Sequence, residues 1–226
     1  LAVLLLLVVL RPDPYLRILR FIPDGIVVTF EVTIAAIACA LVLGLITGIG
    51  RISRNRFVNT LASTYVEIIR GIPLLVQLFY IYYALGRFFQ VPDMVAAVIA
   101  MSVCYGAYMG EVFRAGIESI DKGQTEASRS LGFSRGQTLV YVVLPQAWRT
   151  ILPPVGNEFI ALLKDTSLVS ILAVADMLRR GREFASETFT YFETYTVIAL
   201  VYLLITLLLS KLVSIMEDRL SHYARR

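Results

Sequence analysis

The chain has 226 residues, of which 58% are hydrophobic and 17% are charged, and its formal net charge at pH 7 is +4. Soluble globular domains average about 45–50% apolar and about 25% charged residues. Both fractions are therefore displaced in the direction that a lipid-facing surface requires, which argues against a water-soluble enzyme. Intrinsic disorder is excluded as well, because it requires low hydrophobicity. We expect an all-α membrane protein.

The N-terminal part begins with an apolar run, residues 1–10, that stops at Arg11-Pro12-Asp13-Pro14. As a helix, about ten residues rise only ~15 Å, half of the hydrocarbon core of a bilayer. The run is expected to be the end of a helix that starts before residue 1, and a cleaved signal peptide is the alternative. We therefore divide the chain into an N-terminal extension, residues 1–24, with an apolar end and an external amphipathic stretch, and a membrane domain, residues 25–226.

Within the membrane domain, stretches with few or no charged residues predict transmembrane helices. Four of them lie at residues 32–50, 71–86, 94–110 and 194–210. A fifth is predicted at residues 155–175, although Glu158, Lys164 and Asp165 interrupt it. The turn at residues 51–56 carries three arginines and no acid, so the positive-inside rule assigns it and the C-terminal Arg225-Arg226 to the cytoplasm.

Two features of the predicted spans concern the backbone. Small residues recur at four-residue spacing on one face of the first span, at Ala36, Ala40, Gly44 and Gly48, which predicts close helix packing. The string Gly71-Ile72-Pro73 interrupts the second span, because proline removes a backbone donor. Gly71 and Pro73 thus mark either a broken helix beside a translocation path or a simple packing kink.

Ionisable residues in the spans are expensive unless they are paired or face a wet cavity. Glu67 with Arg70 and Glu111 with Arg114 have i,i+3 spacing, so each pair can form along one helix face, as a structural pair or beside a path. Glu158 has no basic residue one helical turn away. It is therefore a candidate for the lining of a substrate cavity.

The longest polar stretch, residues 111–154, is predicted to fold into helices with short connections. Thr125 is expected to cap one helix, Gly132 to end it, and Ser134-x-x-Gln137 to form a capping box that opens the next. The prolines of Leu144-Pro145 and Leu152-Pro153-Pro154 are expected to end the later turns. A structured loop of this length on one face favours a partner-binding role.

The same stretch resembles the EAA loop, E-A-A-x3-G-x9-I-x-L-P, of ABC importer permease subunits. The spacing matches throughout, with Ser128 in place of the third-position alanine and Val142 in place of isoleucine. Three further segments, residues 67–77, 144–147 and 156–168, resemble the permeases of histidine, glutamine and arginine uptake systems, and the likeness covers residues 25–220. The EAA-loop residues assigned to ATPase coupling are Glu126, Ala127, Ser128, Gly132, Phe133, Leu144 and Pro145.

The resemblance implies a type I ABC importer permease with about five transmembrane helices and a cytoplasmic coupling helix, in the inner membrane of a bacterium. It implies a second permease copy or a related permease, an ATP-binding subunit that holds ATP and Mg, and an extracytoplasmic binding protein that delivers a polar amino acid. Asn157 and Glu158 carry over as substrate-contacting candidates.

The chain itself offers no catalytic, metal or nucleotide site. Its only histidine is His222, and Cys39 and Cys104 lie in separate apolar runs, so neither a zinc site nor a Ser-His-Asp triad can be assembled within one copy. The closest string to a P-loop has Gln137 where the lysine belongs. The alternative function is a self-sufficient secondary transporter or channel for small polar solutes, which the EAA-like loop disfavours.

Overall fold

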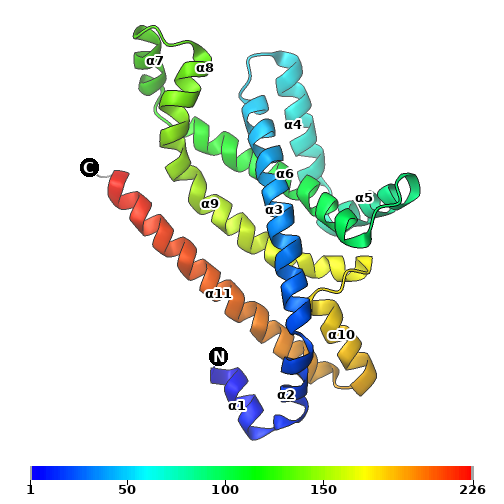
Figure 1. Ribbon diagram of the computed structural model, residues 1–226. Helices are drawn as coiled ribbons and strands as arrows, with labels where there is room; N and C mark the ends of the chain where they lie inside the picture. Colours follow the sequence, from blue (N-terminus) through cyan, green and yellow to red (C-terminus); the bar gives the residue numbers. More distant parts are fainter. Residues whose placement is uncertain (1, 225–226) are drawn as a thin grey trace. The chain divides into compact units, whose positions relative to one another are not determined.

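The structure, a computed structural model that describes residues 2–224, consists of helices without strands in that range (Figure 1). The α-helices are α1 (Ala2–Leu10), α2 (Pro12–Phe21), α3 (Pro23–Arg51), α4 (Arg56–Gly71), α5 (Leu74–Phe88), α6 (Asp93–Glu118), α7 (Lys122–Ser130), α8 (Arg135–Thr138), α9 (Leu144–Asp165), α10 (Met177–Thr188) and α11 (Tyr191–Ala224). A π-helical segment, η1 (Leu139–Val143), precedes α9, and a 3-10 segment, η2 (Thr166–Leu172), follows it. The predicted all-α class is confirmed.

Three of these helices, α3, α6 and α11, are long and apolar enough to cross a membrane. They contain the predicted spans at residues 32–50, 94–110 and 194–210. The span predicted at residues 71–86 is different, because α4 and α5 meet at a 110° bend and count as one broken or re-entrant span at most. The break falls at Ile72, which has an extended backbone with φ −106° and ψ 138°, as expected before Pro73.

The fifth predicted span, residues 155–175, is not one continuous helix. It begins within α9, passes through η2 and reaches Ala173, whose φ is +67°. Lys164 and Asp165 end α9 at the point where the apolar 3-10 segment begins. By length and composition, the described residues supply three spanning helices, or four with the bent pair.

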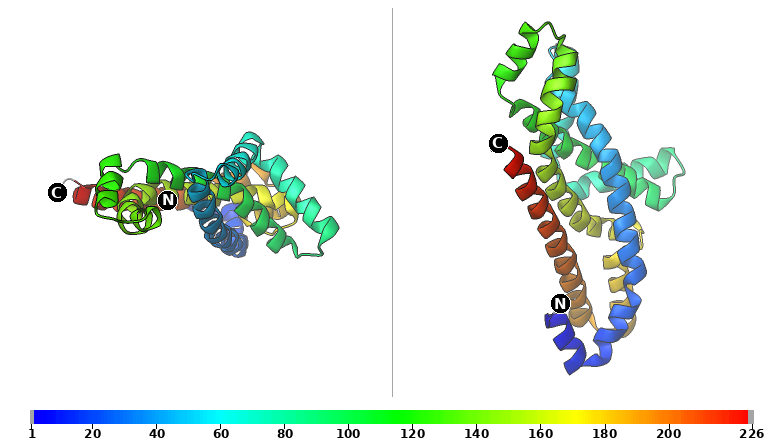
Figure 2. Two further views of the ribbon diagram at one scale, coloured as in Figure 1. Left: turned by 90° about the horizontal axis from the view of Figure 1, so that it is seen from above. Right: turned by 60° about the vertical axis from the view of Figure 1, so that its left-hand side comes forward.

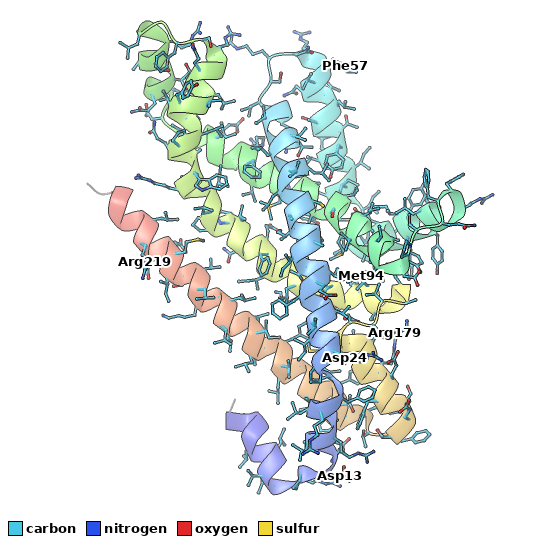
Figure 3. The ribbon with its side chains drawn as sticks, in the orientation of Figure 1. Asp13, Asp24, Phe57, Met94, Arg179 and Arg219 are labelled. Carbon is cyan, nitrogen blue, oxygen red and sulfur yellow. The ribbon has the colours of Figure 1, made fainter. Side chains whose placement is uncertain are left out.

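The chain forms two compact units. The first unit comprises residues 1–38, 73–102 and 159–211, and the second comprises residues 39–72, 103–158 and 212–226. The core of the first unit joins α2, α10 and the start of α11, through Tyr15, Ile18, Ile22, Met177, Phe184, Val197 and Ile198. At the edge of this core an Arg180 Nη lies 2.7 Å from the carboxylate of Asp24, which is labelled in Figure 3.

In the second unit, α3 packs closely against α6 through small residues. A Cβ atom on Gly48 would lie 2.7 Å from the Cβ of Phe113, and one on Gly110 would meet Thr47. The predicted close packing therefore occurs at the glycines of both helices. The start of α4 lies beside the end of α3 (Figure 2), and the side chain of Asn59 donates to the Arg51 carbonyl.

The polar stretch of residues 111–154 contains the predicted helices, but one of them starts at a different residue. Asp121, not Thr125, is the N-cap of α7, because its carboxylate accepts from the Gly123 N–H at 2.7 Å. Thr125 lies one turn inside the helix, so the prediction that it caps α7 is wrong. The capping box of Ser134 and Gln137 is present and opens α8, which confirms that prediction.

The prediction that the prolines of this stretch end helical turns is also wrong. Pro145 lies in the first turn of α9, and Pro153 and Pro154 lie inside that helix. Pro145 is not at a free helix start, because α8, η1 and α9 follow one another without a gap and the Leu144 N–H donates to the Leu139 carbonyl. Directly before it, the wider π-helical turn of η1 reduces the conflict between the proline ring and the preceding carbonyls.

Candidate functional site

A carboxylate surrounded by arginines occupies the second unit. Glu111 on α6 accepts hydrogen bonds from Arg114, one turn later on the same helix, and from Arg51 at the end of α3. Arg70 at the end of α4 lies 3.9 Å from the same carboxylate. Three helices are thereby joined through one acidic side chain that is 27% exposed.

These contacts show which of the two predicted ion pairs is formed. The pair of Glu111 with Arg114 is confirmed. Within the described residues Glu67 forms no ion pair with Arg70, whose guanidinium instead lies near Glu111 and 5.5 Å from the centre of the Tyr108 ring. Sequence reasoning assigned Arg51 only to a basic turn and missed its role, since its partner is 60 residues away along the chain.

A cavity of about 270 Å³ opens beside this cluster. It is lined by the end of α4, the second half of α6 and the middle of α9, and it contains the side chains of Arg70, Glu111 and Glu158. Tyr108 and Thr150 add hydroxyl groups to the lining. The structure thus brings Glu158, a predicted cavity residue, together with two of the predicted path residues.

Asn157, Gly71 and Pro73 do not line this cavity. Asn157 is exposed and is not part of this cavity lining, because it precedes Glu158 by about 100° of helical rotation. Gly71 ends α4, and Pro73 precedes α5, where its carbonyl accepts from Val76 and Gln77 at 3.0 and 3.2 Å. These contacts satisfy the N–H groups of the third and fourth residues of α5.

The EAA-like segment forms α7, the turn after it and α8, which lie side by side (Figures 1 and 2). Gly132 ends the helix as predicted, and its φ of +90° lies in the left-handed region that glycine adopts easily. Its N–H donates to the Arg129 carbonyl at 3.0 Å and the Phe133 N–H donates to the Ser128 carbonyl at 3.2 Å. These two bonds form a Schellman motif that ends α7.

Ser128, the departure from the EAA pattern, has a structural role of its own. Its hydroxyl is buried and bonds the Thr138 hydroxyl at 3.0 Å, which joins α7 to the end of α8. Glu126 and Ala127 are exposed on the other side of α7, and Leu131 beyond the helix end is 80% exposed. Leu144 and Pro145 begin α9. The loop therefore presents a rigid, partly apolar surface that a partner can contact.

A second carboxylate of interest lies in the first unit, just outside the predicted spans. Asp176 is fully buried and caps α10 by accepting from the N–H groups of Leu178 and Arg179 at 3.2 and 3.0 Å. Burial raises the pKa of this carboxyl from 3.8 to about 6, against the lowering effect of the two backbone donors and the nearby arginines.

Apolar spanning helices, a broken helix, a charged cavity and a structured polar loop are together the features of a polytopic membrane transport protein. Residues 40–222 match the family of binding-protein-dependent transport system inner membrane components. The chain belongs to this family. It is an inner-membrane permease subunit of the ABC importer type, so the alternative of a self-sufficient transporter is not favoured.

Relatives agree in length and sequence. The chain is 38% identical over 200 residues to the glutamine transport system permease protein GlnP of Escherichia coli, covering 87% of this chain and 91% of GlnP. It is 41% identical over 204 residues to the L-cystine transport system permease protein TcyB of Bacillus subtilis, covering 89% and 87%. A solved amino acid ABC transporter with histidines matches with a TM-score of 0.85 and 40% identity, covering 90% of this chain and 96% of that one.

Proposed function

We propose that this permease subunit conducts polar amino acids into the cell and that the cavity of Arg70, Glu111 and Glu158 is its substrate site. The observation that carries the proposal is the presence of both signs of charge in one small cavity. A free amino acid is a zwitterion, so it needs an anion for its ammonium group and a cation for its carboxylate. The glutamine and cystine permeases among the relatives support the substrate class.

We assign opposite ends of the substrate to opposite sides of the cavity. Glu158 on α9 receives the α-ammonium group, or a cationic side chain. Arg70 on α4 receives the carboxylate, since its 3.9 Å contact with Glu111 is the longest of the three arginine contacts to that residue. Asn157, one residue before Glu158 and exposed, is a second substrate-contacting candidate.

We also propose that a partner subunit supplies the energy for transport. The exposed Glu126 and Ala127 of α7, with Phe133 after it, are proposed to dock onto an ATP-binding subunit that holds ATP and Mg. Two permease chains, identical or related, complete the pore, and an extracytoplasmic binding protein supplies the substrate. Residues 25–226 are proposed to form this permease domain, with residues 1–24 as an extension.

The test uses the complex of permease, ATP-binding subunit and binding protein reconstituted in vesicles. ATP-driven uptake is measured for the twenty amino acids with the wild type, Glu158→Gln and the matched control Glu187→Gln, an exposed acid of α10. Glu158→Gln is expected to lower uptake at least tenfold with normal complex assembly, because a charge-assisted contact is worth about 1.5–3 kcal/mol. Unchanged uptake by Glu158→Gln removes the residue from the site, and ATP-independent uptake by the permease alone contradicts the whole proposal.

A further inference from the structure

A large open groove in the second unit is separate from the proposed substrate site. Its volume is about 1130 Å³, and it is lined by the end of α3, the turn into α4, the end of α6 and the segment from α7 to η1. None of its lining residues lines the cavity of Glu158. The groove is therefore expected to bind a ligand other than the transported substrate.

The lining of this groove is strongly basic. Its cations come from four different segments and are Arg51, Arg54, Lys122, Arg129 and Arg135, whereas Glu118 is its one acidic residue. Arg51 and Glu118 are engaged by ion pairs with Glu111 and Arg114 respectively. An adjoining hollow of about 520 Å³ shares Arg54, Lys122 and Arg129 and adds Glu126. An anion in the groove would thus meet an excess of positive charge.

Apolar side chains lie directly beside these cations. Ile49 and Ile52 line the groove where α3 ends, and Ile117 and Ile120 line it where α6 ends. Both helices are among the spanning helices, so this part of the groove lies at a membrane boundary. A soluble phosphate needs the cations but not the isoleucines. A phospholipid needs both, since its headgroup is charged and its glycerol and upper acyl chains are apolar.

We propose that this groove binds the phosphate headgroup of an anionic phospholipid from the cytoplasmic leaflet. The leaflet follows from the basic turn at residues 51–56, which the positive-inside rule places in the cytoplasm. Basic pockets between spanning helices on this side suit anionic headgroups. Arg54 in the turn and Arg135 at the start of α8 hold the phosphate from two segments, while the isoleucines contact the acyl chains. The lipid then ties the α3–α4 turn to the loop of α7 and α8.

This proposal does not depend on the transported substrate, so its test needs no transport. The purified permease is equilibrated with mixed phosphatidylglycerol and phosphatidylcholine, and the lipid that remains bound is counted by native mass spectrometry. The wild type is expected to retain phosphatidylglycerol in preference. In Arg54→Gln and Arg135→Gln the affinity for it falls about fivefold for each cation removed, because each basic residue near the surface contributes about 1 kcal/mol.

Two matched controls leave the groove intact. Arg56→Gln changes an exposed arginine of the same turn that does not line the groove, and Arg219→Gln changes an exposed arginine of α11, labelled in Figure 3. Both are expected to retain the lipid as the wild type does. The variant Arg54→Lys with Arg135→Lys keeps the charge and is also expected to bind, which shows that the losses in the glutamine variants do not come from misfolding.

Several results would overturn the proposal. Equal retention of phosphatidylcholine, or an equal loss with Arg56→Gln, would show that the groove does not select the anionic lipid. Displacement of the lipid by millimolar pyrophosphate in the absence of membranes would identify a soluble anion as the ligand. Loss of the lipid when the ATP-binding subunit is added would show that a protein surface occupies the groove.

Discussion

In the first unit the carboxylate of Asp176 is satisfied by the helix that it caps, whereas in the second unit the carboxylate of Glu111 is satisfied by arginines that include two from distant segments. Asp176 accepts from two N–H groups of α10, at 3.2 and 3.0 Å, although this unit also has a long-range bond, from the Met177 N–H to the Thr29 hydroxyl at 3.2 Å. Glu111 instead joins arginines from α3, α4 and α6. A polar network between helices can rearrange when those helices move, and local bonds cannot.

The proposed binding sites lie in the second unit, although a cavity of about 280 Å³ lined by residues of α5 and α6 is present in the first unit. The groove of Arg54, the cavity of Glu158 and the loop of α7 and α8 all belong to the second unit. The first unit also has an apolar core of Tyr, Ile, Met, Phe and Val residues from α2, α10 and the start of α11. We infer that the second unit carries substrate binding and coupling, and that the first provides a stable base.

The largest effect is expected at Gly132. Proline has φ fixed near −65° and lacks the N–H that donates to Arg129, so Gly132→Pro destroys the turn at a local cost of about 3 kcal/mol or more. Substrate-stimulated ATP hydrolysis by the assembled complex should fall more than tenfold. Gly132→Ala keeps the N–H but is strained at positive φ, so it should show a smaller loss. Normal coupling in the proline variant would refute the role of this turn.

The second prediction concerns the first unit and its pH dependence. The pKa of Asp176 is about 6 in the folded protein and 3.8 ordinarily, so the folded state binds the proton more tightly. The contribution of this group to the free energy of unfolding therefore falls as the pH rises from about 4 to about 6. The total loss is up to about 2–3 kcal/mol, and the contribution does not change further above about pH 6.

Asparagine caps helices as well as aspartate does but does not titrate. Asp176→Asn should therefore lack this pH-dependent component, which is measured as the difference in thermal unfolding between variant and wild type from pH 4 to pH 7. The exposed Asp218 of α11 provides a matched control, Asp218→Asn, which should follow the wild type. If the difference in thermal unfolding between variant and wild type is the same at every pH in that range, burial does not perturb the pKa of Asp176.

Local features of this fold were accessible from the sequence. The turn at Gly132, the capping box of Ser134 and the i,i+3 pair of Glu111 with Arg114 each depend on residues within one or two turns of each other. The helix break before Pro73 is of the same kind. Such features are set by backbone geometry and short-range hydrogen bonds, so they need no knowledge of the tertiary arrangement.

Features that depend on tertiary contacts were missed or wrongly predicted. The bond of Arg51 to Glu111 joins residues 60 positions apart in the sequence. In the described part of the chain, Arg70 lies near Glu111 and is not paired with Glu67, although Glu67 is closer in the sequence. The prolines at 153 and 154 lie inside α9, because surrounding structure can hold a helix through a proline that would end it in isolation. The sequence predicted Thr125 as the cap of α7, whereas the structure has Asp121, four residues earlier, in that position.

The smallest predicted effect removes the charge of Glu111. Glu111→Gln weakens bonds to Arg51 and Arg114, and hydrogen bonds to charged groups contribute about 1.5–3 kcal/mol. Because the carboxylate is 27% exposed, we expect about 2 kcal/mol of lost stability. Thermal unfolding of the purified permease in detergent measures this loss. Arg51→Gln should destabilise to a similar extent, since it removes the other half of the α3–α6 contact.

Glu118 provides the control for this prediction, because it pairs with Arg114 on the same helix and is 52% exposed. Glu118→Gln should cost no more than about 0.5 kcal/mol, as exposed pairs within a helix do. Equal effects of Glu111→Gln and Glu118→Gln would mean that the contacts between helices add nothing beyond those within α6. The contrast drawn between the two units would then lose its energetic basis, because the distant pairs of the second unit would be no stronger than ordinary surface pairs.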